Sequence, residues 1–309
     1  MKIITPESTE HKEIFDQGAG VIACDGKFCA GLWFDHTPEY QGESIGTIGA
    51  CQIDDSPEAS VFLSDCANYL HLAHQCATVV GPLNGNTWLQ HRLVIESNGR
   101  DLFLMEPMEP EYFQKTFTAA GFSVLSEYSS STIDLTAEQN NYTSMTSRLE
   151  KNGVTFRSID PAAFEQDLSA IFDLSLISFS SNFLYTPLAK AAFVGKYMSS
   201  RNHIDQDMVI LAERDDKLVG YVFCMPDLMA HKLGKKPAVI IKTLAAIPER
   251  SLSGVGTVLV AKAQQTAKAK GYTEAIHALQ YESNSSLRIS QRFNASVFRK
   301  YALMAKSFS

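Results

Sequence analysis

Residues 244–270 read LAAIPERSLSGVGTVLVAKAQQTAKAK, and this stretch decides the fold. Its first residues complete the apolar run AVIIKTLAAI, which is typical of a strand that is buried on both faces. Pro248 ends that strand, because proline has no backbone N–H to donate. Gly254 and Gly256 then open a helix, which Gly271 closes. We therefore expect a strand, a turn and a glycine-rich helix start.

The start of this helix is suited to an anion. The first N–H groups of a helix have no partner within it, and the helix dipole adds positive charge at the same end. Glycine lets a ligand approach the backbone closely, so a pyrophosphate fits here. The segment is not a nucleotide P-loop, because the GK[ST] ending is absent. It is not the dinucleotide fingerprint either, because Leu259 stands where the third glycine would be.

The segment resembles the GNAT superfamily of acetyl-CoA-dependent acyltransferases. Their motif is a strand, a turn that contains proline, and Q/R-x-x-G-x-G/A at the start of a long helix. Pro248, Gly254 and Gly256 have the usual separation, whereas Ser251 occupies the usual Arg/Gln position. The order of expected elements over residues 153–309 is also similar to that family.

The resemblance implies a cofactor site. The backbone of the strand end, Leu244, Ala245 and Ala246, would pair with the pantetheine amides. The family often has an asparagine after the next strand that contacts the cofactor, and Asn284 stands there. The loop and the helix start would hold the pyrophosphate, through Ser251, Leu252, Ser253, Gly254, Val255, Gly256 and Thr257.

The catalytic residues are less clearly indicated. The family often places a general-acid tyrosine about seven residues after that asparagine, and this position is Gln291 here. Tyr281 and Tyr301 are the substitutes, although either can equally be a core residue whose hydroxyl is bonded. Direct transfer needs a group that accepts a proton from the amine. The candidates near strand ends are Glu282, His277 and Glu213, each of which can instead be an ordinary surface or satisfied polar group.

The first half of the chain has a similar order of expected elements. Phe117 stands where the family's tyrosine often lies, and Gly121-Phe122 matches the family's Gly-Phe. The loop at 54–58 (DDSPE) has no glycine, and its acidic residues would repel a pyrophosphate. We therefore expect a degenerate GNAT-like domain without a cofactor loop. Residues 81–88 (GPLNGNTW) are either a substrate or interdomain loop or a compact turn anchored by Trp88.

The expected fold class is α/β (α+β), with two GNAT-like domains. Each domain is expected to have a mixed, mostly antiparallel central sheet flanked by helices. The degenerate domain spans 1–136, a polar linker spans 137–152, and the acetyl-CoA-binding domain spans 153–309. A chain of 309 residues has room for two such cores.

Composition limits the partners. The net charge of −7 and short basic clusters argue against a nucleic acid, and no run reaches the roughly 18 apolar residues of a membrane span. With no apolar segment at its start, the protein is expected to be cytoplasmic, with reduced cysteines as small buried hydrophobes. His71 and His74 could share a face with a cysteine, but no zinc spacing is present, and no metal is expected.

The sequence thus predicts an N-acyltransferase that moves an acetyl group from acetyl-CoA to an amine on a small molecule or a peptide. The main alternative is a CoA-binding or regulatory protein without turnover, which the absence of the motif Arg/Gln and tyrosine favours. Transfer from an aminoacyl-tRNA is a third possibility by analogy of fold, and the acidic charge argues against it. The sequence does not identify the acceptor or the oligomeric state.

Overall fold

The computed structural model describes residues 1–138 and 140–308. Up to residue 138 it contains one main set of strands, a small β4–β5 pair and three helices. The strands are β1 (Lys2–Ile4), β2 (Val21–Asp25), β3 (Phe28–Trp33), β4 (Glu39–Tyr40), β5 (Glu43–Ser44), β6 (Gly46–Gln52), β7 (Thr78–Gly81), β8 (Leu93–Ser97) and β9 (Ser123–Asp134). The helices are α1 (Lys12–Phe15), α2 (Pro57–His74) and α3 (Tyr112–Ala119).

The rest of the chain supplies six further strands, six α-helices and three short 3₁₀ helices within the described residues. The strands are β10 (Thr155–Ser158), β11 (Val209–Arg214), β12 (Lys217–Pro226), β13 (Ala238–Ala246), β14 (Glu274–Tyr281) and β15 (Ser296–Ser307). The helices are α4 (Thr143–Lys151), α5 (Phe164–Phe179), α6 (Lys190–Ser199), α7 (Leu228–Lys232), α8 (Val255–Ala269), α9 (Ser285–Arg292), η1 (Arg201–His203), η2 (Gln206–Met208) and η3 (Arg250–Leu252).

One continuous sheet runs through both halves of the chain. Its strand order is β1-β2-β3-β6-β7-β15-β9-β14-β13-β12-β11-β10, and β8 pairs with β15 outside this path. The pairs β6–β7 and β13–β14 are parallel, and the other described pairs of this sheet are antiparallel. The expected mixed, mostly antiparallel sheet with flanking helices is confirmed.

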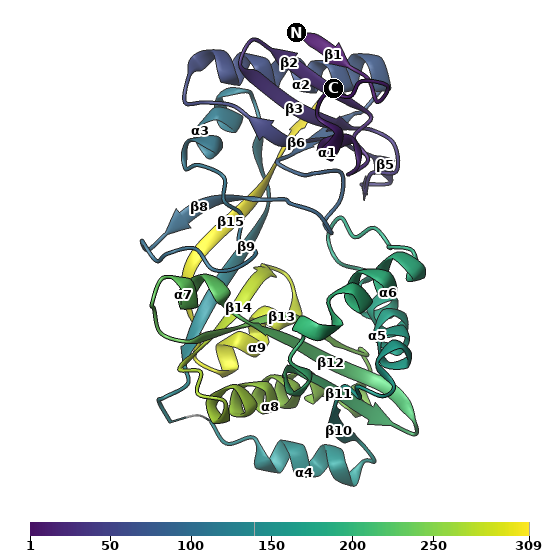
Figure 1. Cartoon of the computed structure of the whole chain (residues 1–309), viewed down its shortest axis with the longest axis vertical. Helices are drawn as coiled ribbons and strands as arrows, with labels where there is room; N and C mark the ends of the chain where they lie inside the picture. Colours follow the sequence, from purple (N-terminus) through teal and green to yellow (C-terminus); the bar gives the residue numbers. More distant parts are fainter. Residues whose placement is uncertain (139, 309) are drawn as a thin grey trace.

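The two halves exchange their last strands. β9 closes the first half along the chain, yet it pairs with β14, as Glu274 opposite Asp134 shows. β15 closes the second half and pairs with β7, where Met304 lies opposite Gly81. Figure 1 shows β15 and β9 side by side along the long axis of the molecule, linking the two ends. β9 therefore completes the sheet of the second half, and β15 completes the sheet of the first half.

Alternate residues of the second-half strands bury against different helices. Ile210 and Val222 pack in the cluster that includes α8, whereas Leu211 and Tyr221 pack with α5 and α6. Because successive side chains of a strand point to opposite faces, α8 covers one face of the sheet and the α5–α6 pair covers the other. α8 begins at Val255 and stops before Gly271, whose φ of 89° is left-handed, as the sequence predicted.

Two local features differ from or extend the sequence analysis. Cys24 and Cys29 lie opposite each other in the β2–β3 hairpin and form a disulfide, so the expectation of a reduced pair is wrong at this hairpin. Their sulfurs and the His11 ring lie within 4.8 Å of one another.

The segment expected as a linker contains α4, which contacts α8. Of the helices described, none has the length and apolar character to span a membrane.

Candidate functional site

The centre of the site is a gap between β13 and β14. These parallel strands pair from Ala238 opposite Glu274 to Ile241 opposite His277, and pairing then stops although both strands continue. The β12–β13 register shifts at the same place, across Lys242, as at a β-bulge. The result is an opening between the ends of β13 and β14.

The backbone of β13 has free groups at this opening. The Ile247 N–H bonds the Val219 carbonyl at 2.9 Å, so odd-numbered residues at this end direct their backbone groups toward β12. Alternation then directs the backbone N–H and C=O of Leu244 and Ala246 toward the opening. The Ala246 carbonyl accepts a hydrogen bond from Ser178, and Leu244 is left to pair with an extended ligand.

A cavity of about 230 Å³ fills the opening. Leu244 and Asn284, which the sequence predicted for the cofactor, both line it, as does Tyr281. Ala245 is buried and paired with Tyr221 in β12. The other lining residues come from both halves of the chain: Thr87, Arg92, Tyr128, Phe179, Asn182, Phe183, Tyr185, Ile241, Lys242, Thr243, Val260, His277, Ala278, Leu279, Gln280, Ser286 and Ile289.

The start of α8 lies beside this cavity. Gly254 is the N-cap with a φ of 99°, and Val258 is the first residue of α8 whose N–H reaches back to it, at 2.9 Å. The preceding N–H groups, from Val255 to Thr257, therefore lack acceptors within the helix. A Cβ on Gly256 would lie 3.0 Å from Ile289 and 3.7 Å from Leu244, both of which line the cavity.

An arginine approaches this helix start from α4. One terminal nitrogen of Arg148 lies 3.3 Å from where a Cβ on Gly254 would stand, and it donates to the Ser253 carbonyl. The Ser251 hydroxyl is occupied by Arg214, at 2.8 Å, and by Glu249. Of the predicted loop, Leu252, Val255, Gly256 and Thr257 are buried and Ser253 is exposed. Arg148 thus brings positive charge to the start of α8, whereas Ser251 occupies the motif position itself.

A second and larger cavity of about 550 Å³ adjoins the first. The two share part of their walls, and Lys242 and Leu279 belong to both. The first half contributes residues 87–92 and 103–108, and α6, β13 and β14 contribute the remainder. The gap between β13 and β14 thus opens on one side to a small cavity near α8 and α9 and on the other to a larger one between the halves.

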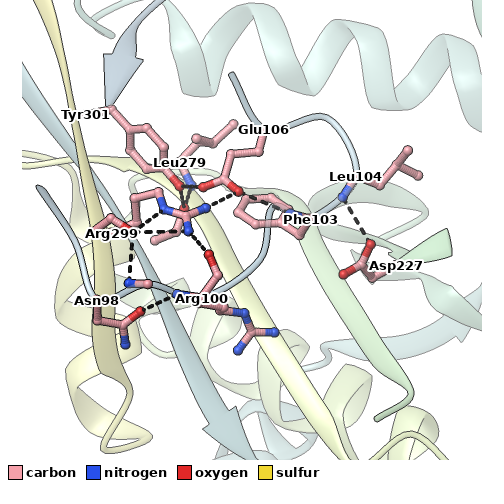
Figure 2. Close-up of polar contacts among 12 residues, drawn as sticks. Asn98, Arg100, Phe103, Leu104, Glu106, Asp227, Leu279, Arg299 and Tyr301 are labelled. Carbon is pink, nitrogen blue, oxygen red and sulfur yellow. Dashed lines mark hydrogen bonds and ion pairs between the residues drawn. The ribbon is translucent and has the colours of Figure 1, made fainter. Parts of the chain in front are cut away.

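The first-half wall of the larger cavity is held in place by β15. Glu106 is buried, accepts hydrogen bonds from Arg299 and Tyr301 of β15, and accepts the Phe103 N–H at 3.1 Å. Asp227 accepts the Leu104 N–H at 3.0 Å. Figure 2 shows these contacts converging on the segment that includes Glu106. The wall is therefore anchored to elements of the second half.

The three predicted catalytic residues lie in different surroundings. Tyr281 lines the smaller cavity, with its ring 5.4 Å from that of Phe183. Tyr301 is fully buried, and its hydroxyl donates to Glu106; burial and the neighbouring carboxylate raise its pKa. Glu282 is exposed and lines neither of the two cavities among the described residues. The geometry brings only Tyr281 of these three to the opening.

Two further proton-accepting candidates are already engaged. His277 lines the smaller cavity, but its ring nitrogens contact Gln264 at 3.2 Å and Ser290 at 2.5 Å. Burial lowers its pKa to about 4, so the ring is neutral and held in place at neutral pH. Glu213 is paired with Arg157. Both groups stabilise the domain rather than face an acceptor.

Sequence reasoning missed two basic residues, Arg92 and Lys242, each of which lines both cavities. Burial, with a smaller contribution from Lys196, lowers the pKa of Lys242 to about 8. The Arg92 guanidinium lies 4.1 Å from the ring centre of Tyr128. A sequence signal did exist for Lys242, because it is the one charged residue in the apolar run AVIIKTLAAI.

The loop at 81–88 is both a compact turn and an interdomain contact. Asn84 fixes the turn, since its Oδ1 accepts the Ala50 N–H at 2.8 Å and its Nδ2 donates to Gln17. The Trp88 indole N–H donates to the Thr186 carbonyl in the second half at 2.7 Å. Both alternatives offered by the sequence therefore describe part of this loop.

The corresponding helix start in the first half has a different charge. α2 begins after Ser56, and its loop carries Asp54, which pairs with Lys27, and Asp55, which lies 3.5 Å from Lys115. Glu58 adds a further acidic group in the first turn. These charges agree with a copy that lacks a cofactor loop.

Comparison with known families gives one match, which lies in the second half. Residues 170–293 match the family model described as acetyltransferase (GNAT) family. This segment contains the gap between β13 and β14, the start of α8 and Asn284. The second half of the chain therefore contains a segment that matches the GNAT acetyltransferase family. No curated protein sequence matches the chain at a significant level.

Solved structures resemble nearly the whole chain in fold. A GCN5-related glucosamine N-acetyltransferase region of a fungal multi-domain GH3 β-N-acetylglucosaminidase aligns over 96% of this chain, at a TM-score of 0.55 and 15% identity. This chain covers 34% of that protein. A GCN5-related N-acetyltransferase from Sphaerobacter thermophilus gives 0.55 and 13% identity, with 93% of this chain and 79% of that chain covered. A tandem GNAT protein from the clavulanic acid biosynthesis pathway, without AcCoA, gives 0.52 and 11%, with 93% and 82% covered.

Proposed function

We propose that this chain, whose second half is a GNAT acetyltransferase domain, transfers an acetyl group from acetyl-CoA to an amine acceptor. One observation carries the proposal: the unpaired ends of β13 and β14 open between two cavities, beside the start of α8. An extended thioester in the smaller cavity and an amine in the larger one would meet at this gap. The first half would serve as a wall of the acceptor cavity.

The residues of the second half would bind acetyl-CoA in three places. The backbone of Leu244 would pair with the pantetheine amides at the open edge of β13. The N–H groups from Val255 to Thr257, together with Arg148, would bind the pyrophosphate, because both offer positive charge to an anion. The side chain of Asn284 would contact the cofactor from the start of α9.

Transfer would proceed by direct attack of a neutral amine on the thioester carbonyl. A C–N bond forms and the C–S bond breaks. The amine proton goes to solvent, the thiolate takes a proton from Tyr281, and Tyr281 regains one from solvent. Nearby cations disfavour an ammonium group, so Arg92 and Lys242 would help to keep the bound amine neutral. Polarisation of the thioester carbonyl by a backbone N–H at the open edge of β13, together with positioning of the two substrates, would supply the acceleration.

The substitution Ser253→Asp tests the cofactor site. Ser253 is exposed just before α8, so a carboxylate there would oppose a pyrophosphate while favouring the helix dipole. We expect acetyl-CoA affinity to fall at least about tenfold, with the melting temperature unchanged or raised. Isothermal titration calorimetry and a thermal melt measure both quantities. Substitutions of Gly254 would be less informative, because its φ of 99° strains any other residue.

Ser253→Ala is the matched control and should keep wild-type affinity. Equal acetyl-CoA affinity in the aspartate variant would contradict the placement of the pyrophosphate at α8. Absence of acetyl-CoA binding by the wild type would overturn the proposed function.

The alternative is a CoA-binding or regulatory protein without turnover. The observation that favours it is the pair of departures from the family motif: Ser251 is bound to Arg214 and Glu249, and Gln291 is exposed where a tyrosine is usual. Acetyl-CoA binding without thiol release across a broad panel of amines would support this alternative.

A further inference from the structure

We propose that the acceptor amine also carries an anionic group, a carboxylate or a phosphate, which Arg92, Lys196 and Lys242 bind in the larger cavity. This inference rests on the proposed transfer to an amine and specifies the class of acceptor. The three cations come from the loop before β8, from α6 and from β13, and all line that cavity. Two of them belong to the second half and one to the first, so the subsite exists only when the halves are assembled.

The three basic side chains have no carboxylate partner. Within residues 1–138 and 140–308, none of them takes part in an ion pair. The Nε of Arg92 is enclosed without a hydrogen-bond partner in this part of the chain. Lys242 lies against the rings of Tyr197 and Phe223, at 5.7 and 5.5 Å from their centres. Arg92 and Lys242 are partly buried, whereas Lys196 is exposed. A desolvated cation is stabilised when an anion binds.

The carboxylates on the same walls are already neutralised. Glu106 is bound by Arg299 and Tyr301. An adjoining cavity of about 250 Å³, which Lys196 and Lys242 also line, contains Asp205, and this carboxylate lies 2.8 Å from Lys270. These walls therefore offer net positive charge to a ligand, although the chain as a whole has a net charge of −7.

This charge selects among amines. A simple amine arrives as an ammonium ion and is repelled by three like charges. An amine that carries a carboxylate or a phosphate is attracted, and the Arg92 guanidinium can bind either group in a bidentate manner. Burial and repulsion from Lys196 lower the pKa of Lys242, which agrees with the absence of an acidic partner between the two lysines.

Matched pairs of amines test the proposal. Glycine is compared with glycinamide, and phosphoethanolamine with ethanolamine, by thiol release from acetyl-CoA with the full chain. We expect kcat/KM to be at least about tenfold higher for the anionic member of one pair. A preference for glycine over glycinamide would identify the anionic group as a carboxylate, and a preference for phosphoethanolamine over ethanolamine would identify it as a phosphate. Arg92→Gln and Lys196→Gln should each remove most of this preference. Lys196→Gln should also leave the Kd of acetyl-CoA unchanged, because Lys196 lines the larger cavity and not the smaller one. Lys217→Gln is the control, because Lys217 is exposed and lines neither cavity.

Calorimetric titration of glycine and phosphoethanolamine without acetyl-CoA separates the two proposals. Binding that depends on Arg92 supports the anion subsite even where acetyl-CoA fails to bind, which would overturn only the transfer reaction. Equal rates for the charged and uncharged members of both pairs would overturn the anionic acceptor and keep the transferase. The absence of binding by both glycine and phosphoethanolamine would likewise overturn the anionic acceptor.

Discussion

At the scale of single residues, Lys242 links the stability of the protein to its site. It belongs to a strand that is otherwise apolar, and it lies opposite a shift in the β12 register that brings it to the opening. Its ammonium group touches aromatic rings rather than a carboxylate. We infer that this lysine reduces stability and is kept for binding, because a desolvated cation without a partner disfavours the folded state.

Lys242→Met should therefore stabilise the protein. The pKa of Lys242 falls from its usual 10.5 to about 8 on folding, through burial and then Lys196. Below pH 8 the Lys242 side chain is charged in both the folded and the unfolded chain, and only the folded chain removes this charge from water. Between pH 8 and 10.5 the unfolded chain binds more protons, so this group makes the free energy of unfolding rise with pH. The variant should gain up to about 2 kcal/mol at pH 7, and the gain should shrink toward pH 10.

Urea unfolding at pH 7, 8, 9 and 10 measures this difference. Lys217→Met provides the comparison at an exposed position and should show no such dependence on pH. A loss of stability in Lys242→Met that is equal at every pH would refute the account of a desolvated charge.

At the scale of elements, the two tyrosines that the sequence offered as substitutes for the general acid lie in different surroundings. Tyr281 lies at the end of β14 and lines the smaller cavity. Tyr301 lies within β15 and bonds Glu106, and through it holds the segment at 103–108 that walls the larger cavity. A hydroxyl at the opening can act on the thioester, whereas a buried hydroxyl can act only through the wall that it holds.

The two Tyr→Phe variants should therefore separate. Tyr281→Phe is expected to lower kcat about 10–100-fold, with the melting temperature and the Kd of acetyl-CoA unchanged, because a proton donor is lost. Tyr301→Phe should lower the free energy of unfolding by about 1–3 kcal/mol and raise the KM of the acceptor, because the Glu106 carboxylate loses a buried partner. Steady-state kinetics and chemical unfolding of both variants give these values. The reverse pattern, with catalysis lost only in Tyr301→Phe, would assign the proton donor to β15.

At the scale of the whole molecule, the exchange of closing strands makes the two halves depend on each other. Without residues from the other half, β14 loses its pairing with β9, and β7 loses its pairing with β15. Each fragment would then expose a long unpaired edge, which favours aggregation over folding. The larger cavity would also lose one of its two walls.

The chain divided after residue 152 should show this dependence. Fragments 1–152 and 153–309 are expected to be insoluble or partly folded when produced separately, and to form a complex of full-chain size when produced together. The intact chain should unfold in a single transition by calorimetry. Gel filtration and circular dichroism test the fragments. A fragment 153–309 that unfolds cooperatively by itself would show that β9 is dispensable for that half.

The sequence by itself determined the unit of β13, its turn and α8, together with the general fold class. Apolar runs, Pro248 and the glycines act through neighbours a few residues away, so their effect can be read directly along the chain. The resemblance to the GNAT family, rather than local chemistry, implied a shared cofactor site for Leu244 and Asn284, and both residues line the smaller cavity.

Only the tertiary structure decided which strand completes which half and which cations meet at the opening. Residues 81–88 read equally as a turn or a contact, because the indole of Trp88 finds its acceptor at Thr186, 98 residues away. Arg92 and Lys242 are separated by a still longer stretch of chain and share a cavity through the assembled sheet. Local patterns carry no information on such pairings, since these depend on packing between segments that are distant in sequence.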